Sequence, residues 1–224
     1  MPFTLAHPAV VLPFWKSTRW LHFPALALGS MAPDFEYFLR GKPVGIYGHT
    51  VAGIFWCDLP LLIAVFIVGK FLIGSPFAKR ALVFSASVFL YSALLGIFSH
   101  LAWDSFTHAQ GTMAMQIPVL LKKIHGFQVC RILQHGSSVA GLAVIAWFAF
   151  ARRALWREKY NAAFFAVCAV VATVLFLAWW WFAPVTLARP GTLVVRAVDS
   201  AAAGFVVACL LQRLGKLDYR RGSA

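Results

Sequence analysis

The strongest constraint on the fold is a succession of long, nearly uncharged apolar runs. The chain is 61% hydrophobic and only 12% charged, whereas about a quarter of the residues in soluble domains are charged. A helix needs about 20 residues to cross a roughly 30 Å hydrocarbon core, and runs without period-two alternation are not barrel strands. We therefore predict an all-α, polytopic membrane helix bundle with about five transmembrane helices, at 59–73, 81–103, 138–151, 162–183 and 193–211.

The first 58 residues are also apolar, but prolines interrupt them. Proline ends or kinks a helix because it lacks a backbone N–H, so this segment is expected to form short or re-entrant helices. We predict a single membrane domain over 1–224, in which 1–58 contributes site residues, 59–135 carries the site-bearing helices and an outer loop, and 136–224 is scaffold. The prolines that interrupt the segment after its first residues are Pro8, Pro13, Pro24, Pro33 and Pro43.

The formal net charge of +13 is carried mainly by short loops between the apolar runs. In that setting Lys and Arg orient the chain and meet anionic headgroups, so no nucleic-acid partner is expected. The positive-inside rule makes two loops and the segment after the last span cytoplasmic, and leaves 104–137 outside. The cations concerned are Lys79, Arg80, Arg152, Arg153, Arg157, Lys159, Arg213, Lys216, Arg220 and Arg221.

Titratable groups gather in the first part of the chain, and all seven histidines precede residue 136. In SHLAWDSFTHAQG, His100, Asp104 and His108 are four residues apart, which keeps them on one face of a helix. Imidazole and carboxylate together suit zinc, with iron or manganese as alternatives. We interpret this stripe as one arm of a metal site, the alternative being ordinary polar residues at the membrane interface.

Two further stretches offer ligands for the same site. HTVAGIFWCD supplies His49 and Asp58, and MAPDFEYF supplies Asp34; Asp58 and the equivocal His135 are additional candidates. His22 and His125 are interpreted as interfacial residues.

Arg196 and Asp199, three apart in the last span, are expected to form a structural ion pair, with a transport site as the alternative. The four cysteines are predicted to be packing residues, with a Cys57–Cys130 disulfide as the alternative.

The ordered motifs MPFTLAHPAVVLP, GSMAPDFEYF, HTVAGIFWCDLP, SHLAWDSFTH and ILQHGSS resemble the bacterial membrane-protein family of domain of unknown function 4184. The resemblance covers most of the first two thirds of the chain. It implies a location in the bacterial cytoplasmic membrane and supplies no activity.

A more distant likeness, in the order of His and Asp residues, is to zinc-dependent phospholipase C, the single-strand nucleases and related membrane-bound metal-dependent hydrolases. It implies that His49, His100 and Asp104 bind one metal ion and that Asp104 bridges to a second ion held by His7. Asp34 would then activate water, and His108 would serve a further ion. The sequence departs from that pattern at two places, since Met1 to Ala6 precede His7 and Val139 stands where a late HxxxE would end. One or two ions are therefore expected.

The resulting hypothesis is a metal-dependent hydrolase acting on a phosphoester at the membrane surface, either a phospholipid or a lipid-linked phosphate. Lys122, Lys123 and Arg131 could attract an anionic headgroup, although a solvated loop explains them equally. Two alternatives are a proton- or ion-coupled transporter that uses the His/Asp cluster and a non-catalytic scaffold stabilised by metal. Membrane lipids are the expected partners, and the sequence leaves the oligomeric state open.

Overall fold

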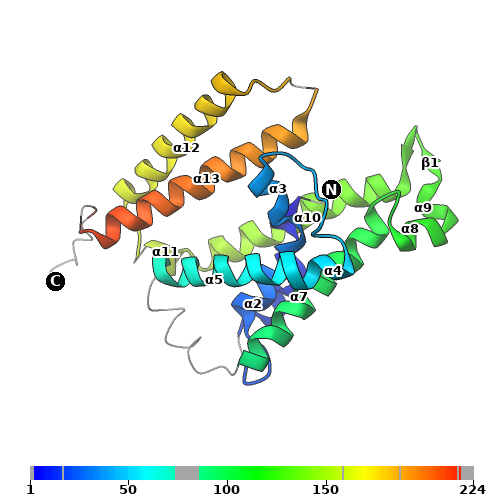
Figure 1. The fold of residues 1–224 in the computed structure, drawn as a ribbon, viewed down its shortest axis with the longest axis horizontal. Helices are drawn as coiled ribbons and strands as arrows, with labels where there is room; N and C mark the ends of the chain where they lie inside the picture. The colour runs from blue at the N-terminus through cyan, green and yellow to red at the C-terminus, as the bar shows by residue number, and fades with distance from the viewer. Residues whose placement is uncertain are drawn as a thin grey trace. The chain divides into compact units, whose positions relative to one another are not determined.

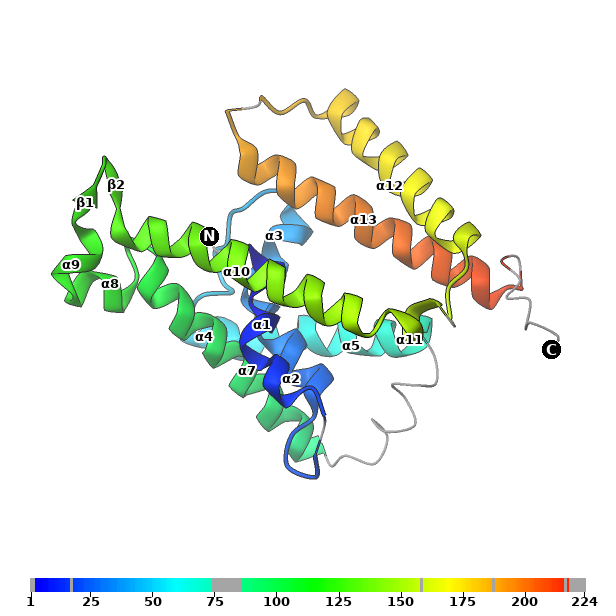
Figure 2. The same ribbon diagram turned by 180° about the vertical axis from the view of Figure 1, so that it is seen from behind.

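The computed structural model describes residues 3–16, 18–73, 86–157, 159–186, 188–215 and 217 (Figures 1 and 2). Within them, five helical stretches are long and apolar enough to cross a membrane, which confirms the all-α polytopic architecture. They are Val51–Ile73, Ala86–Gln116, Val129–Ala151, Ala162–Phe182 and Pro190–Arg213. The predicted start of the second span, at 81–85, and the predicted cytoplasmic Lys79, Arg80, Lys216, Arg220 and Arg221 lie outside the described residues.

Two spans begin well before the residue at which the sequence predicts their start. The first starts with α4 (Val51–Gly53) and the π-helical turn η4 (Ile54–Asp58), which lead into α5 (Leu59–Ile73). The third, α10 (Val129–Ala151), includes a polar stretch that the prediction assigned to a loop. There Ser137 and Ser138 donate side-chain hydrogen bonds to the Gln134 carbonyl, at 3.2 and 2.8 Å. Because these hydroxyls bond within the helix, they do not interrupt it.

The N-terminal segment forms short helices, as expected. Pro8, Pro13, Pro24 and Pro33 each stand in the first turn of one of them, where the missing N–H would have no helical partner anyway. These four prolines therefore stand where short helices begin. In chain order these are η1 (Thr4–Ala6), α1 (Pro8–Val11), η2 (Leu12–Phe14), α2 (Phe23–Gly29), η3 (Ala32–Asp34) and α3 (Phe35–Arg40).

The chain divides into two compact units, of which the first comprises Met1–Phe35, Ile46–Ile67 and Pro76–Ala151. Its core lies where α2 packs on α7 (Ala86–Thr107), and Gly29 and Gly96 let the two backbones touch. A Cβ at Gly96 would stand 2.3 Å from the Leu26 carbonyl oxygen and 2.8 Å from the Gly29 Cα. Small residues at a crossing allow such close approach between membrane helices. Residues on these two helices are therefore held in a fixed register.

His22 is part of this packing and is not a solvent-exposed residue. Its side chain is 1% exposed, and its Nδ1 accepts a hydrogen bond from the Ala25 N–H at 3.2 Å, which caps the start of α2. His125, by contrast, is exposed in the turn between β1 (Lys123–Ile124) and β2 (Phe127–Gln128).

The remainder of the first unit connects α7 to α10 through α8 (Thr112–Gln116), α9 (Pro118–Leu121) and the β1–β2 hairpin. Ala114, Leu120 and Cys130 form a small core beneath this connection. All four cysteines are free, and three of them are buried. They are packing residues, and the Cys57–Cys130 disulfide is absent.

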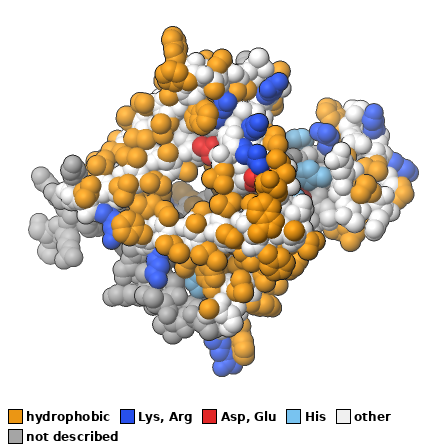
Figure 3. All heavy atoms as spheres, viewed as in Figure 1, with side chains coloured by type: hydrophobic (Ala, Val, Ile, Leu, Met, Phe, Trp, Pro, Cys, Tyr) orange, Lys and Arg blue, Asp and Glu red, His pale blue; other side chains and the backbone are white. Residues whose placement is uncertain are grey.

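The second unit comprises Glu36–Gly45, Val68–Ser75 and Arg152–Ala224. It contains α11 (Arg153–Arg157) and the packed pair α12 (Ala162–Phe182) and α13 (Pro190–Arg213). Its core residues are Leu72, Tyr160, Phe164, Ala208 and Cys209. Hydrophobic side chains cover most of the helical surface in view, as expected where helices face lipid (Figure 3).

The predicted Arg196–Asp199 ion pair is not among the contacts of the described residues. Arg196 instead donates to the carbonyl of Ala183, and its guanidinium lies 4.7 Å from the ring centroid of Trp179. A carbonyl at the end of α12 has no helical donor, so it accepts this cation readily.

Candidate metal centre

Five titratable side chains from four segments of the first unit converge beside α7. His100 and Asp104 lie one turn apart on α7 and are both buried. The other three come from the N-terminal segment and the loop before α4: His7 between η1 and α1, Asp34 at the end of η3, and His49. The four-residue spacing thus supplies one wall of the cluster, and the proline-initiated helices supply the rest.

Two imidazole nitrogens and two carboxylate oxygens of this cluster lie close together. The Nε2 atoms of His49 and His100 are 3.4 Å apart. Asp34 Oδ1 lies 3.6 Å from the first and 3.7 Å from the second, and Asp104 Oδ2 lies 3.5 Å from each. Two ligands of one tetrahedral ion with bonds of about 2.1 Å are roughly 3.4 Å apart. The separations are too long for good hydrogen bonds and match those between ligands of a single ion.

His100 is oriented for this role by a contact behind it. Its ring is fully buried, and Nδ1 lies 2.9 Å from the carbonyl oxygen of Ser30. A carbonyl only accepts, so Nδ1 carries the proton and the lone pair of neutral His100 is on Nε2. Metal-binding histidines characteristically donate their second nitrogen in this way. Ser30 directly follows Gly29, so the close α2–α7 crossing sets this contact.

Asp104 is the hub of the cluster. Its Oδ2 lies 3.6 Å from His108 Nδ1, in addition to the two Nε2 atoms, and its Oδ1 lies 3.7 Å from His7 Nε2. His108 follows the last residue of α7, and its Nδ1 is 3.1 Å from the Asp104 carbonyl oxygen. One carboxylate therefore faces two different sets of nitrogen atoms, as a bridging ligand would.

Asp34 and His7 are held by the burial of the N-terminal helices. Thr4 donates its hydroxyl hydrogen bond to Asp34 Oδ2 at 2.6 Å, which leaves Oδ1 facing the cluster. Burial raises the pKa of Asp34 above its usual value. Burial lowers the pKa of His7 to about 3. His7 is therefore neutral, and its ring stacks on His100 with centroids 3.9 Å apart.

The residues present fit a bound cation. His7 Nε2, Asp34 Oδ1 and Asp104 Oδ1 are buried and have no hydrogen-bond partner among the described residues. Buried polar atoms are costly unless they are paired or coordinate a metal. Two ligand groups have all their donor atoms within 4.8 Å of one another: His7, Asp34 and His100, and His49, His100 and Asp104. The sharing of His100 between the two groups makes one compact centre.

Close backbone packing holds the segment that begins at Phe3 and the His49 loop in place around the cluster. A Cβ at Gly48 would lie 2.2 Å from the Pro33 carbonyl oxygen, so only glycine lets the His49 loop approach Asp34. At the other end, the Phe3 N–H donates to Ser138 Oγ on α10 at 2.9 Å. The fold therefore fixes both segments before any ion binds.

Comparison with known proteins assigns the chain to a family. Residues 1–214 match the family described as Domain of unknown function (DUF4184). The chain belongs to that family. No curated protein and no solved structure matches it. The family description names no activity.

The sequence-predicted residues of this DUF4184 protein do not all join the ligand groups. His108 touches Asp104 from the rim, with 30% of its side chain exposed. Asp58 is fully buried, with Oδ1 3.1 Å from the place where a Cβ on Gly48 would stand. His135 is exposed on α10, where it lines a groove with Arg131. None of these three belongs to either ligand group.

Two residues that support the site were missed from the sequence. Thr4 orients Asp34, and the Ser30 carbonyl orients His100. Thr4 is distant from Asp34 along the chain and has no distinctive motif, and a backbone carbonyl leaves no trace in residue identity. The one sequence signal for Ser30 is that it directly precedes the MAPD motif, which contains Asp34.

Proposed function

We propose that this protein is a membrane-bound, metal-dependent hydrolase acting on a phosphoester at the membrane surface, either a phospholipid or a lipid-linked phosphate. The observation that carries the proposal is the convergence of His7, Asp34, His49, His100 and Asp104, with three buried donor or acceptor atoms unpaired. Polar groups of this kind at a membrane helix are costly and mark functional sites.

The ligand atoms could hold one ion or two. His49, His100 and Asp104 Oδ2 would hold the first, and Asp104 Oδ1 with His7 would contribute to a second. Two imidazoles and a carboxylate suit zinc, with iron or manganese as alternatives. Such ions polarise phosphoryl oxygens, lower the pKa of bound water and stabilise the leaving oxygen.

Asp34 is the residue we assign to the attacking water. Its Oδ2 is occupied by Thr4, so Oδ1 is the atom that faces the ligand group. From that position Asp34 would orient the water and accept its proton as the oxygen attacks phosphorus. The proton then passes to the departing alcohol, which balances the hydrolysis.

Access to the cluster favours an enzyme over a closed structural site. His49 and His108 each have 30% of the side chain exposed, whereas His100 and Asp34 are buried. Catalytic zinc sites keep one open coordination position, and structural sites are closed by protein ligands. The exposed Lys122, Lys123 and Arg131 would attract an anionic headgroup. We further propose that this side faces outward from a bacterial cytoplasmic membrane, with the C-terminus in the cytoplasm.

The decisive experiment measures phosphoester cleavage by purified protein in lipid nanodiscs. The protein is loaded with Zn²⁺, Mn²⁺ or Fe²⁺ and given phosphatidylglycerol, phosphatidylcholine or a polyprenyl diphosphate, and released phosphate species are followed by ³¹P NMR. We expect release that stops with EDTA and is lost in Asp34→Asn, but persists in Asp199→Asn, which alters a carboxylate of the second unit. Metal-loaded protein that cleaves none of these lipids would reject the hydrolase.

A further inference from the structure

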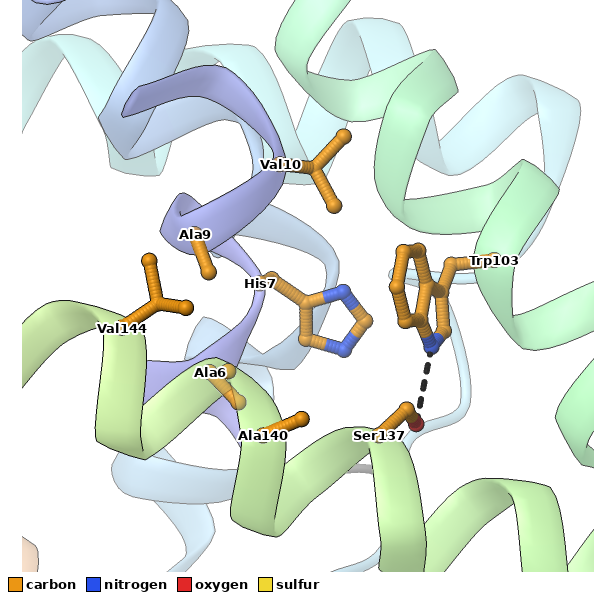
Figure 4. Close-up of a pocket in the computed structure, with 9 residues that line it drawn as sticks. Ala6, His7, Ala9, Val10, Trp103, Ser137, Ala140 and Val144 are labelled. Atoms are coloured by element: carbon orange, nitrogen blue, oxygen red, sulfur yellow. Dashed lines mark hydrogen bonds between the residues drawn. The ribbon is translucent and has the colours of Figure 1, made fainter. Parts of the chain in front are cut away.

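A cavity of about 330 Å³ lies beside the metal centre, between α1, α7 and α10 (Figure 4). Its walls are almost entirely apolar. The indole of Trp103 forms one side, and the side chains of Ala6, Ala9, Val10, Ala140 and Val144 form much of the rest. Its volume is within the range of about 300–1,000 Å³ typical of small-molecule sites.

The polar groups in the cavity wall are few, and one is already engaged. Ser137 Oγ accepts a hydrogen bond from Trp103 Nε1 at 3.2 Å, as drawn in Figure 4, and donates to the Gln134 carbonyl. His7 is then the polar side chain that remains available to an occupant. An occupant that fills this space must be apolar over most of its length, since a polar one would lose its hydrogen bonds to water.

His7 also connects the cavity to the metal centre. The same imidazole that lines the cavity lies 3.7 Å from Asp104 through Nε2 and stacks on the ring of His100. A molecule in the cavity would therefore end against the ligand cluster. Elsewhere in the cluster, His49 and His108 are partly exposed. Water therefore reaches the centre at these two side chains, and the apolar cavity reaches it at His7.

The edge of the cavity belongs to the lipid-facing surface of the unit. Val10 and Val144 are 41% and 42% exposed, and Val144 lies within the membrane-spanning stretch Val129–Ala151. Hydrocarbon chains, and not water, surround such a surface in a bilayer. A chain could enter the cavity laterally without leaving an apolar environment.

We propose that this cavity binds one hydrocarbon chain of a membrane phospholipid whose phosphate group lies at the metal centre. This inference rests on the proposed function and narrows its substrate to an amphipathic lipid held by its chain. The cavity fixes the depth of the lipid, so that the phosphate is presented to Asp34 and Asp104. The polar headgroup then extends past His49 and His108 toward water.

The test is photo-labelling of the full-length protein in nanodiscs that contain a phosphatidylglycerol with a diazirine in one acyl chain. After illumination, labelled peptides are mapped by mass spectrometry. We expect adducts on the cavity residues Ala9, Val10 and Val144. Val144→Trp, which fills the cavity from its edge, is expected to reduce this labelling at least tenfold. Val139→Trp is the matched control, because Val139 lies on the same helix and lines a different groove.

The outcomes separate this inference from the proposed function. Labelling spread over the outer helix faces, or unchanged in Val144→Trp, would overturn the chain-binding cavity. So would labelling that Val139→Trp alone abolishes, since it would place the lipid in the groove beside Arg131 and His135. Metal content and ³¹P-detected cleavage are measured on the same samples. Cavity labelling without metal or cleavage would reject the hydrolase and leave a lipid-binding cavity. Cleavage without cavity labelling would support the hydrolase and reject the chain-binding cavity.

Discussion

The two compact units differ in the partners of their buried or half-buried polar side chains. In the second unit, Arg196, Lys159 and Arg213 donate to backbone carbonyls near the ends of α12 and α5. These carbonyls are the groups that a helix leaves without partners, and cations near them are stabilised further by the helix dipole. In the first unit, the His and Asp side chains of the metal centre face one another.

That difference separates structural polar groups from a binding site. A cation that donates to the end of a helix gives that carbonyl a partner within the chain, although Arg196 Nε itself is buried without a partner among the described residues. The first unit leaves buried atoms of His7, Asp34 and Asp104 without partners in one place. Asp199 and Ser200 also have buried unpaired atoms in the second unit, but no ligand group forms around them among the described residues. Convergence, and not burial alone, indicates a ligand.

The largest expected effect comes from removing the hub of the metal centre. Asp104→Asn keeps the size of the side chain but removes its charge and one acceptor oxygen. Loss of a residue that merely supports a ligand costs about 10–100-fold in metal affinity, so we expect a loss of about 100-fold or more. Metal content after dialysis and a competitive zinc titration measure it. Asp199→Asn should leave the metal content and the zinc affinity unchanged. An equal loss in Asp104→Asn and Asp199→Asn would contradict the assignment of the metal site to the first unit.

A second comparison places the same steric change in each unit. A Cβ at Gly96 would lie 2.3 Å from the Leu26 carbonyl, and one at Gly204 would lie 2.5 Å from the Cys168 carbonyl. Overpacking typically costs about 1–3 kcal/mol, so Gly96→Ala and Gly204→Ala should both lower the thermal midpoint. Only Gly96→Ala should lower metal occupancy, because it separates His100 from Ser30. Equal occupancy in the two variants would show that the α2–α7 contact does not position the site.

The pH dependence of the metal-free protein tests the burial of His7. The pKa of His7 is lowered to about 3 from 6.5, so the unfolded chain binds this proton more readily than the folded one. His7 therefore reduces the free energy of unfolding as the pH falls from 6.5 toward 3, by about 1.4 kcal/mol per pH unit. Melting curves between pH 4 and 7 should show a steeper decline in the parent than in His7→Gln. The exposed His125→Gln is the control and should keep the steep decline.

The smallest expected effect compares two side-chain hydrogen bonds. Thr4→Val removes the bond to Asp34, and Asn161→Ala removes the bond to the Phe164 N–H that caps α12. Each is expected to cost about 1 kcal/mol of stability. Thr4→Val should in addition weaken metal binding about 10–100-fold, as for other residues that orient a ligand. Calorimetric melting and a zinc titration on both variants distinguish stability from site geometry, and unaltered affinity in Thr4→Val would contradict the role given to Thr4.

Much of the fold follows from local properties of the chain. The apolar runs determine five spans because only helices satisfy the backbone within a membrane. The prolines determine that the N-terminal segment is broken, and the spacing of His100 and Asp104 determines that they share a face. The boundaries were less accurate at α10, because a serine that bonds its own helix is indistinguishable in sequence from a loop serine.

The tertiary structure decided which residues surround the face of α7 that carries His100 and Asp104. Residues far apart in the sequence, such as Thr4 and Asp34 or Ser30 and His100, meet only through the packing of α2 on α7 and of η1 on α10. The same packing excluded Asp58 and His135 from the ligand groups and opened the cavity beside His7. The sequence by itself thus determined the membrane helices and the identity of the available ligands, since both depend on composition and short-range periodicity. Which ligands converge depends on contacts between distant segments, and these exist only once the helices pack.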